Sequence, residues 1–187
     1  MNFANKISTF RILTVPFFIA SLVYYSPQRN YLRFVALGIF LLAAISDAAD
    51  GYVARKSKQQ SKAGLILDPL GDKLLLMSAF ICLYANTSLS PRFPLWVILI
   101  VISRDVIIIL GAVVVYIVKQ GINIIPTRWG KFSTLFQMLA VISVLLQLEI
   151  SLLFWWLAAV FTVVSGAIYI NRGFIILYDL DNSRNNH

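Results

Sequence analysis

The sequence predicts an all-α integral membrane protein with six transmembrane helices, from its composition, its length and the spacing of its apolar runs. Hydrophobic residues make up 59% of the chain, mean hydropathy is +0.81, and 13% of the residues are charged. Soluble domains carry about a quarter charged residues. Six spans of about 20 residues use about 120 positions, so a chain of 187 residues holds six helices and little else. A soluble domain with an added anchor is excluded, and the single cysteine, Cys82, excludes a disulfide framework.

Six apolar runs define the expected helices: 12–25, 32–49, 69–86, 94–118, 132–148 and 151–171. Residues 1–11 mix polar and apolar side chains, so we expect a juxtamembrane segment along the membrane surface. No small-residue cleavage site follows the first run, so we expect it to remain as a helix. Proline or glycine marks the breaks at 26–27, 90–94 and 121–126, whereas Glu149 and Ser151 alone mark the break at 148–151. The chain is expected to form one domain over 1–187 with a polar tail over 173–187.

The basic residues predict both the orientation and the class of partner. The net charge is +8, and the basic residues are scattered among the spans, which favours anionic lipids or phosphorylated substrates over nucleic acid. With a cytoplasmic N-terminus, the opposite side keeps only Arg29, Arg33 and Arg92, and Arg104 lies inside a span. By the positive-inside rule both termini therefore face the cytoplasm. The cytoplasmic side then collects Lys6, Arg11, Arg55, Lys56, Lys58, Lys62, Lys73, Lys119, Arg128, Lys131, Arg172 and Arg184.

Four of the eight carboxylates lie in the stretch 47–72. Asp47 and Asp50 are spaced i,i+3 at the end of the second span, and Asp68 and Asp72 are spaced i,i+4 at the start of the third, so each pair shares a helix face. Carboxylates gathered at the membrane boundary repel one another and lose hydration, whereas a divalent cation would neutralise them. An all-oxygen set suits Mg²⁺, Mn²⁺ or Ca²⁺ rather than zinc. The alternative is that these are helix-end residues in water, with Asp68 capping the third span before Pro69.

These aspartates belong to a longer pattern of fixed positions. The chain reads Asp47-Ala-Ala-Asp50-Gly51-Tyr-Val-Ala54-Arg55, then eight residues, Gly64, three residues, Asp68, three residues and Asp72. This resembles the signature D-x-x-D-G-x-x-A-R-x8-G-x-x-x-D-x-x-x-D of the CDP-alcohol phosphatidyltransferases, and all eight fixed positions match. Asn5-x-x-Ser8-x-x-Arg11 is similar to the entrance of that family's first span.

The resemblance implies an enzyme that moves a phosphatidyl group from CDP-diacylglycerol to an alcohol and releases CMP. It implies two divalent ions, Mg²⁺ or Mn²⁺, that neutralise the diphosphate of the donor. Asp47, Asp50 and Asp68 are then metal ligands, and Asp72 joins a second metal and is the candidate general base. The implied donor-binding residues are Asn5, Ser8, Arg11, Asp50, Gly51, Ala54, Arg55, Gly64 and Asp68. The small residues among them can equally serve close helix packing, and we expect Lys56, Lys58 and Lys62 to be positive-inside charges.

The resemblance favours glycerol 3-phosphate as the acceptor and phosphatidylglycerophosphate as the product. Arg128, Lys131 and Arg172 lie on the expected cytoplasmic side, where cationic side chains suit a dianionic acceptor. Their alternative role is interfacial anchoring. Gly130-Lys131-x-x-Thr134-x-x-Gln137-Met138 resembles a stretch of the phosphatidylglycerophosphate synthases, but the cardiolipin synthases that use CDP-diacylglycerol share the Lys131-containing pattern, so Lys131 does not separate the two acceptors. The family further implies a homodimer in the inner (cytoplasmic) membrane of a bacterium, among membrane lipids, with its active site on the cytoplasmic side.

Three alternatives stay open. Ser103-Arg104-Asp105 resembles a tripeptide of the cardiolipin synthases that use CDP-diacylglycerol, whose acceptor is phosphatidylglycerol. Arg104 and Asp105 are costly inside a span, and because they are adjacent we expect each to pair with another helix as a buried structural group. A divalent-cation carrier is a second alternative, although transport sites usually lie nearer mid-membrane. A non-catalytic scaffold is a third, but it has no use for the acidic pattern.

Overall fold

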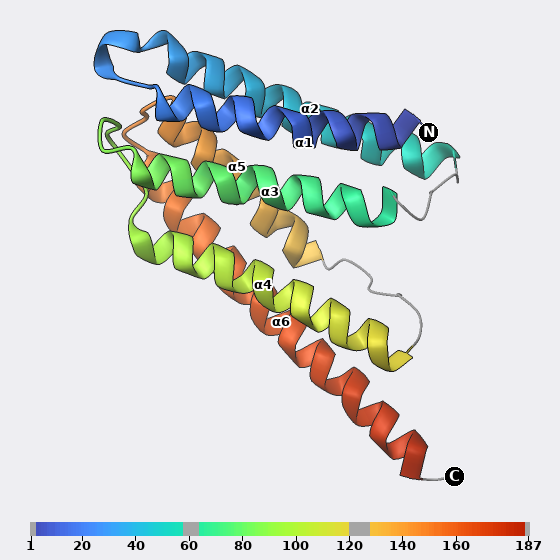
Figure 1. The fold of residues 1–187 in the computed structure, drawn as a ribbon. Coiled ribbons are helices and arrows are strands. Elements are labelled where there is room, and N and C mark those ends of the chain that lie inside the picture. Colours follow the sequence, from blue (N-terminus) through green and yellow to red (C-terminus); the bar gives the residue numbers. More distant parts are fainter. Residues whose placement is uncertain (1–2, 58–63, 120–127, 186–187) are drawn as a thin grey trace. The chain divides into compact units, whose positions relative to one another are not determined.

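The computed structural model describes residues 3–57, 64–119 and 128–185, and within them the side chains of 11–46, 73–111 and 128–175. These residues form six α-helices, one short 3-10 helix and no strand (Figure 1). The bounds are α1 Phe3–Val23, η1 Pro27–Arg29, α2 Tyr31–Ser57, α3 Gly64–Ala85, α4 Leu95–Lys119, α5 Arg128–Leu145 and α6 Ser151–Asn185. The prediction of an all-helical chain is confirmed.

Helices α1, α2, α3 and α6 extend furthest beyond the apolar runs; α2 ends at Ser57 rather than 49, and α3 begins at Gly64 rather than 69. α1 begins at Phe3 and continues through Pro16, so residues 3–11 form its first turns rather than a separate segment. α6 continues to Asn185 and includes most of the expected polar tail. Helices extend through polar residues wherever backbone hydrogen bonds continue, so the end of an apolar run does not fix the end of a helix.

The break between α5 and α6, which few turn residues marked, is a Schellman motif. Gln147 has a φ of 55°, in the left-handed region. The Leu148 N–H donates to the Ser143 carbonyl and the Gln147 N–H donates to the Val144 carbonyl, each at 2.9 Å. This is the bonding that closes a helix C-terminus around a left-handed residue. Glycine usually occupies that position, so a glutamine there hid the helix end from sequence-based prediction.

The contacts of the chain divide it into two compact units, and the expectation of one domain stays a prediction. Unit 1 comprises Met1–Pro94 and Val141–Ser151. Within it α1 packs against both α2 and α3. The ring centroids of Phe18 on α1 and Phe40 on α2 lie 6.0 Å apart. The Asn86 side chain, just after α3, donates a hydrogen bond of 2.7 Å to the Leu22 carbonyl of α1. α1 is therefore the central helix of this group.

Unit 2 comprises Leu95–Ala140 and Leu152–His187. The rings of Phe136 on α5 and Phe161 on α6 stack with centroids 4.6 Å apart. Buried polar groups join the same two helices, because Gln137 Nε2 donates to Thr162 Oγ1 at 2.9 Å and to Ser133 Oγ at 3.2 Å. These bonds fix the position of α5 along α6.

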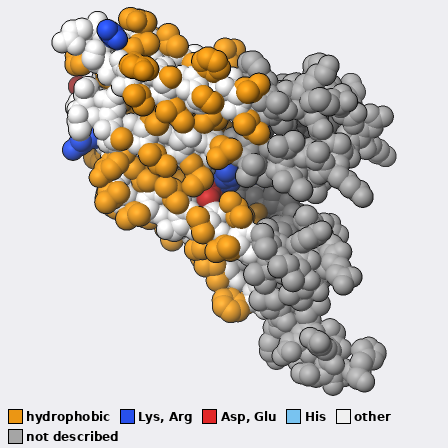
Figure 2. Space-filling view, in the orientation of Figure 1, with side chains coloured by type: hydrophobic (Ala, Val, Ile, Leu, Met, Phe, Trp, Pro, Cys, Tyr) orange, Lys and Arg blue, Asp and Glu red, His pale blue; other side chains and the backbone are white. Residues whose placement is uncertain are grey.

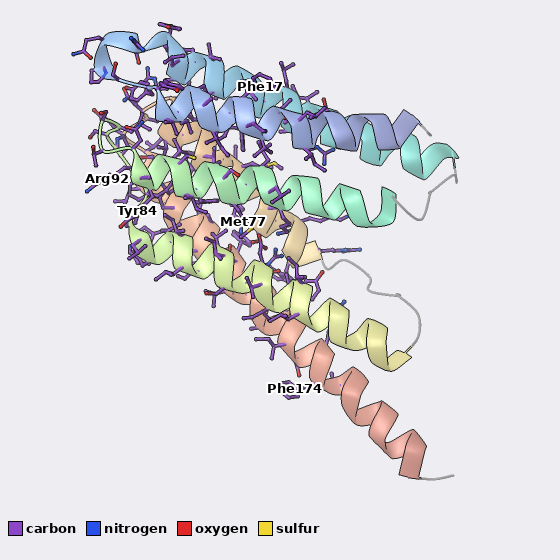
Figure 3. All side chains as sticks on the ribbon, viewed as in Figure 1. Phe17, Met77, Tyr84, Arg92 and Phe174 are labelled. Carbon is purple, nitrogen blue, oxygen red and sulfur yellow. The ribbon has the colours of Figure 1, made fainter. Side chains whose placement is uncertain are left out.

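The described surface is largely apolar, as expected for a protein that contacts lipid. Hydrophobic side chains cover much of the face in Figure 2. Phe174, 69% exposed, projects from α6 into open space (Figure 3). Within the described residues one stretch, Ser151–Ile175 of α6, is long and apolar enough to cross a membrane. Shorter apolar helical stretches cover Arg11–Val23, Tyr31–Ser46 and Lys73–Ala85.

Candidate active site

The helical backbone brings the four aspartate positions to one end of unit 1. Asp47 and Asp50 lie ten and seven residues before the end of α2, and Asp68 and Asp72 lie four and eight residues after the start of α3. At 1.5 Å per residue, all four are within about 15 Å of the helix ends that the connection 58–63 joins. A connection of this length spans at most about 25 Å, so the two ends are neighbours (Figure 1). The side chains of these aspartates lie outside the described residues.

The N-terminal turns of α1 lie at the same end of unit 1. α1 and α2 are joined by the short connection 24–30 and run in opposite directions, so α1 starts where α2 finishes (Figure 1). Asn5 and Ser8 lie on these first turns, and their side chains lie outside the described residues. Arg11, about 12 Å along α1, is 1% exposed. The structure therefore places a buried cation on the helix that contacts both acid-bearing helices.

The small residues of the pattern occupy the last turns of α2 and the first residue of α3. Gly51, Ala54 and Arg55 lie within seven residues of the end of α2, and Gly64 is the residue at which α3 begins. Their side-chain surroundings lie outside the described residues. The backbone thus groups every member of the acidic pattern at one end of unit 1.

The three basic residues expected to bind the acceptor lie toward one end of unit 2. Arg128 and Lys131 are exposed on the first turn of α5, and Arg172 is exposed on α6. The 3.0 Å hydrogen bond between Ser133 Oγ and Thr162 Oγ1 sets the register of the two helices. Counting along each helix from that bond, Arg172 lies about 15 Å and Arg128 about 8 Å from it in the same direction, because α5 and α6 are antiparallel.

Arg104 and Asp105 form a buried pair with each other, which corrects the expectation that they would pair with other helices rather than with each other. Arg104 Nη1 lies 2.7 Å from Asp105 Oδ1, and the two side chains are 7% and 0% exposed. The arginine chain is long enough to fold back onto its neighbour, and burial makes this carboxylate the nearest compensating charge. Arg104 Nη2 also donates to Ser165 Oγ of α6 at 2.9 Å, so the expected contact with a second helix is present for the arginine.

Comparison with known proteins connects this arrangement to a family. The family model described as CDP-alcohol phosphatidyltransferase matches residues 1–164. The chain belongs to the CDP-alcohol phosphatidyltransferase family. A relative from Aquifex aeolicus named CDP-diacylglycerol–glycerol-3-phosphate 3-phosphatidyltransferase is 34% identical over 145 residues, which are 77% of this chain and 75% of the relative.

Two further relatives of this CDP-alcohol phosphatidyltransferase carry related names. A probable phosphatidylglycerophosphate synthase of Mycobacterium tuberculosis (strain H37Rv) is 31% identical over 177 residues, covering 91% of this chain and 81% of the relative. A CDP-diacylglycerol–glycerol-3-phosphate 3-phosphatidyltransferase of Haemophilus influenzae is 32% identical over 144 residues, covering 74% of this chain and 72% of the relative. The resemblance stated from the sequence is confirmed, and with it the enzyme class, a transferase of phosphatidyl groups.

The residues of this CDP-alcohol phosphatidyltransferase fit the divalent cation on which its family depends. Asp47, Asp50, Asp68 and Asp72 supply only oxygen donors, which hard divalent cations prefer. They come from two neighbouring helix ends, and the i,i+3 and i,i+4 spacings put each pair on one helix face. The donor types and the backbone placement of these four positions are therefore compatible with a divalent cation.

Sequence-based prediction missed the polar cluster of Ser133, Gln137 and Thr162 in this transferase. All three residues are fully buried, and Gln137 belongs to the stretch that resembles phosphatidylglycerophosphate synthases. Ser133 and Gln137 are spaced i,i+4 in an apolar run, which places them on one face of a helix. That spacing was the available signal for a polar contact between helices.

Proposed function

We propose that this enzyme transfers the phosphatidyl group of CDP-diacylglycerol to glycerol 3-phosphate, which forms phosphatidylglycerophosphate and releases CMP. The observation that carries the proposal is the meeting of two acidic helix ends at one end of unit 1, in a chain with a complete family signature. The names of the relatives from Aquifex aeolicus and Haemophilus influenzae support the donor and the acceptor.

The four aspartates are proposed to hold two divalent ions, Mg²⁺ or Mn²⁺. Asp47, Asp50 and Asp68 act as ligands, and Asp72 contributes to the second ion. When bound, the ions neutralise the donor diphosphate and increase the electrophilicity of its phosphorus. Asp72 also accepts the proton of the acceptor hydroxyl as the hydroxyl oxygen forms the new ester bond to phosphorus. The bond between that phosphorus and the bridging oxygen of the diphosphate breaks, and CMP leaves with its electrons.

The donor is proposed to bind at the same end of unit 1, among α1, α2 and α3. Arg11 and Arg55 are suited to its phosphates, because guanidinium groups donate paired hydrogen bonds to phosphate oxygens. The absence of bulk at Gly51, Ala54 and Gly64 lets a nucleotide approach the helix backbone. The complete proposed set is Asn5, Ser8, Arg11, Asp50, Gly51, Ala54, Arg55, Gly64 and Asp68.

The acceptor phosphate is proposed to bind Arg128, Lys131 and Arg172. All three are exposed and lie toward one end of unit 2, so their charges are available to a soluble dianion. Cardiolipin synthesis, with phosphatidylglycerol as acceptor, was suggested by the tripeptide that contains Arg104 and Asp105. These two side chains are buried and bonded to each other, as a structural pair would be, which weighs against a role in binding a lipid acceptor.

We also propose that the six helices cross a bacterial inner membrane, with both termini and the active site on the cytoplasmic side. An even number of crossings returns the chain to its starting side. The excess of Lys and Arg at the aspartate-bearing end supports the cytoplasm as that side. The assembly is proposed to be a homodimer surrounded by membrane lipids.

Purified protein in detergent tests the reaction directly. CDP-diacylglycerol with labelled glycerol 3-phosphate should give labelled lipid and CMP when Mg²⁺ or Mn²⁺ is present, and neither product in EDTA. Asp72→Asn should lower the rate about 10²–10⁴-fold, the usual contribution of a general base. Glu149→Gln, an exposed carboxylate outside the acidic pattern, is the matched control and should retain full activity.

Three results would contradict the proposal. Full activity in Asp72→Asn would remove the base. A product with two phosphatidyl groups from phosphatidylglycerol, without incorporation of glycerol 3-phosphate, would identify a cardiolipin synthase. Flux of divalent cations into proteoliposomes without CMP release would identify a carrier.

A further inference from the structure

Arg33 is a buried cation without a compensating charge among the described residues. It is the third residue of α2 and is 7% exposed. Its Nε and Nη1 are enclosed and have no hydrogen-bond partner within the described part of the chain. Arg104 is equally buried, at 6%, but Asp105 neutralises it. An isolated buried guanidinium is strongly unfavourable and cannot lose its charge by deprotonation, so the position indicates an anionic ligand.

The surroundings of Arg33 add to its positive potential. The first turn of α2 carries the positive end of the helix dipole, and its N–H groups lack intrahelical acceptors, although that of Arg33 donates to the Asn30 carbonyl at 3.2 Å. Side chains of a helix lean toward its N-terminus, so the guanidinium lies on the same side as these groups. Its described contact is with the ring of Phe34, 4.8 Å from Arg33 Cζ. An aromatic ring attracts a cation but leaves its net charge unchanged.

This end of unit 1 is basic as a whole. It lies opposite the end that bears the aspartates, and Figure 3 shows Tyr84 and Arg92 there. The charged side chains described at this end are Arg29, Arg33, Arg92 and Glu149. Three cations against one carboxylate leave an excess of positive charge, although the positive-inside rule disfavours Arg on the side away from the cytoplasm.

The depth in the membrane at which α2 begins indicates the chemical identity of the anion. Tyr24 and Tyr31 are exposed on either side of the turn that precedes α2. Exposed tyrosines in a membrane protein mark the boundary between lipid and water, where phospholipid headgroups lie. We propose that Arg33 and the N-terminus of α2 bind the headgroup phosphate of an anionic phospholipid, on the membrane side opposite the proposed active site.

The geometry indicates how such a phosphate reaches the guanidinium. Because Nε and Nη1 are enclosed, Nη2 is the nitrogen that an incoming anion meets first. Phe34 is exposed and its ring lies 4.8 Å from Arg33 Cζ, so rotation of that ring gives a phosphate wider access to the guanidinium. A phosphodiester then accepts hydrogen bonds from two nitrogens of one guanidinium, the arrangement that arginine favours with phosphate.

Thermal unfolding of the full-length protein in detergent tests the site, with phosphatidylglycerol, phosphatidylcholine or inorganic phosphate added. Phosphatidylglycerol should raise the Tm of the wild type by about 5 °C, the shift expected for one charge-assisted contact in a protein of this size. Arg33→Gln should lose this increase and Arg33→Lys should keep part of it. Arg92→Gln, the matched exposed arginine of the same end, should keep nearly all of it.

Two further measurements separate this inference from the proposed reaction. Without lipid, Arg33→Gln should be at least as stable as the wild type, because the substitution removes an uncompensated buried charge. Its metal-dependent release of CMP should match the wild type, because Arg33 lies away from the aspartates. An equal response of Arg33→Gln and wild type to phosphatidylglycerol would overturn the site. A response to inorganic phosphate or phosphatidylcholine as large as that to phosphatidylglycerol would overturn the assignment to an anionic lipid.

Discussion

Replacement of Asp105 by asparagine would leave Arg104 charged and buried inside unit 2 without its compensating carboxylate. The pair is separated by 2.7 Å, and its side chains are 7% and 0% exposed. Loss of one partner from a buried ion pair costs about 3–5 kcal/mol. Because the asparagine oxygen and the Ser165 hydroxyl still accept hydrogen bonds, we expect a cost of about 3 kcal/mol, at the lower end of that range.

This cost translates into a measurable change in thermal stability. For a chain of this length, 1 kcal/mol corresponds to about 2–4 °C in Tm, so Asp105→Asn should unfold about 6–12 °C below the wild type in the same detergent. Ser165→Ala, which removes one hydrogen bond to a charged group, should cost about 1.5 kcal/mol and about 3–6 °C. Both variants should unfold as single transitions.

The double variant distinguishes charge compensation from packing. Arg104→Met fills the path of the arginine methylenes without a charge, so its combination with Asp105→Asn leaves no buried ion. We expect this double variant to recover at least half of the stability lost in Asp105→Asn. If the stability lost in the double variant equals the sum of the losses in Arg104→Met and Asp105→Asn measured singly, the two charges do not interact. A Tm of Asp105→Asn equal to that of the wild type would refute the argument outright.

Three other substitutions test local features of the fold by thermal unfolding. Gln147→Gly should stabilise the protein by about 0.5–1 kcal/mol, because glycine adopts a φ of 55° without a steric penalty; a lower Tm would contradict the left-handed helix end. Asn86→Ala should cost about 1–3 kcal/mol by removing the hydrogen bond to the Leu22 carbonyl, whereas an unchanged Tm would show that this bond contributes nothing. A Cβ at Gly166 would lie 3.5 Å from Arg104 Cγ. Gly166→Ala should therefore be tolerated and Gly166→Val should lower the Tm by several degrees; equal effects would show that this contact is not tight.

Hydropathy and spacing predicted the number of helices and the backbone placement of the acidic residues. The i,i+3 spacing of Asp47 and Asp50 and the i,i+4 spacing of Asp68 and Asp72 depend only on helical geometry, which any α-helix provides. The helix ends were harder to predict. α6 continues beyond its apolar run because its polar residues form the same backbone hydrogen bonds.

Side-chain partnerships depended on tertiary burial, which spacing does not encode. Adjacent residues of a helix point in different directions, so the mutual pairing of Arg104 and Asp105 was not expected. Only the burial of both groups beside α6 makes the fold-back of the arginine favourable. In the same way, the sequence does not reveal that the charge of Arg33 is uncompensated, because there Arg33 is one of three arginines assigned to the side opposite the cytoplasm.

α5 contributes to both units, because residues up to Ala140 belong to unit 2 and residues from Val141 belong to unit 1. Neither unit is thus a continuous stretch of chain. A fragment that stops at Pro94 lacks the segment Val141–Ser151, and a fragment that starts at Leu95 carries that segment away from the helices it completes. During synthesis, the acid-bearing unit can close only after Val141–Ser151 has left the ribosome, so truncation of the gene is a poor route to that unit alone.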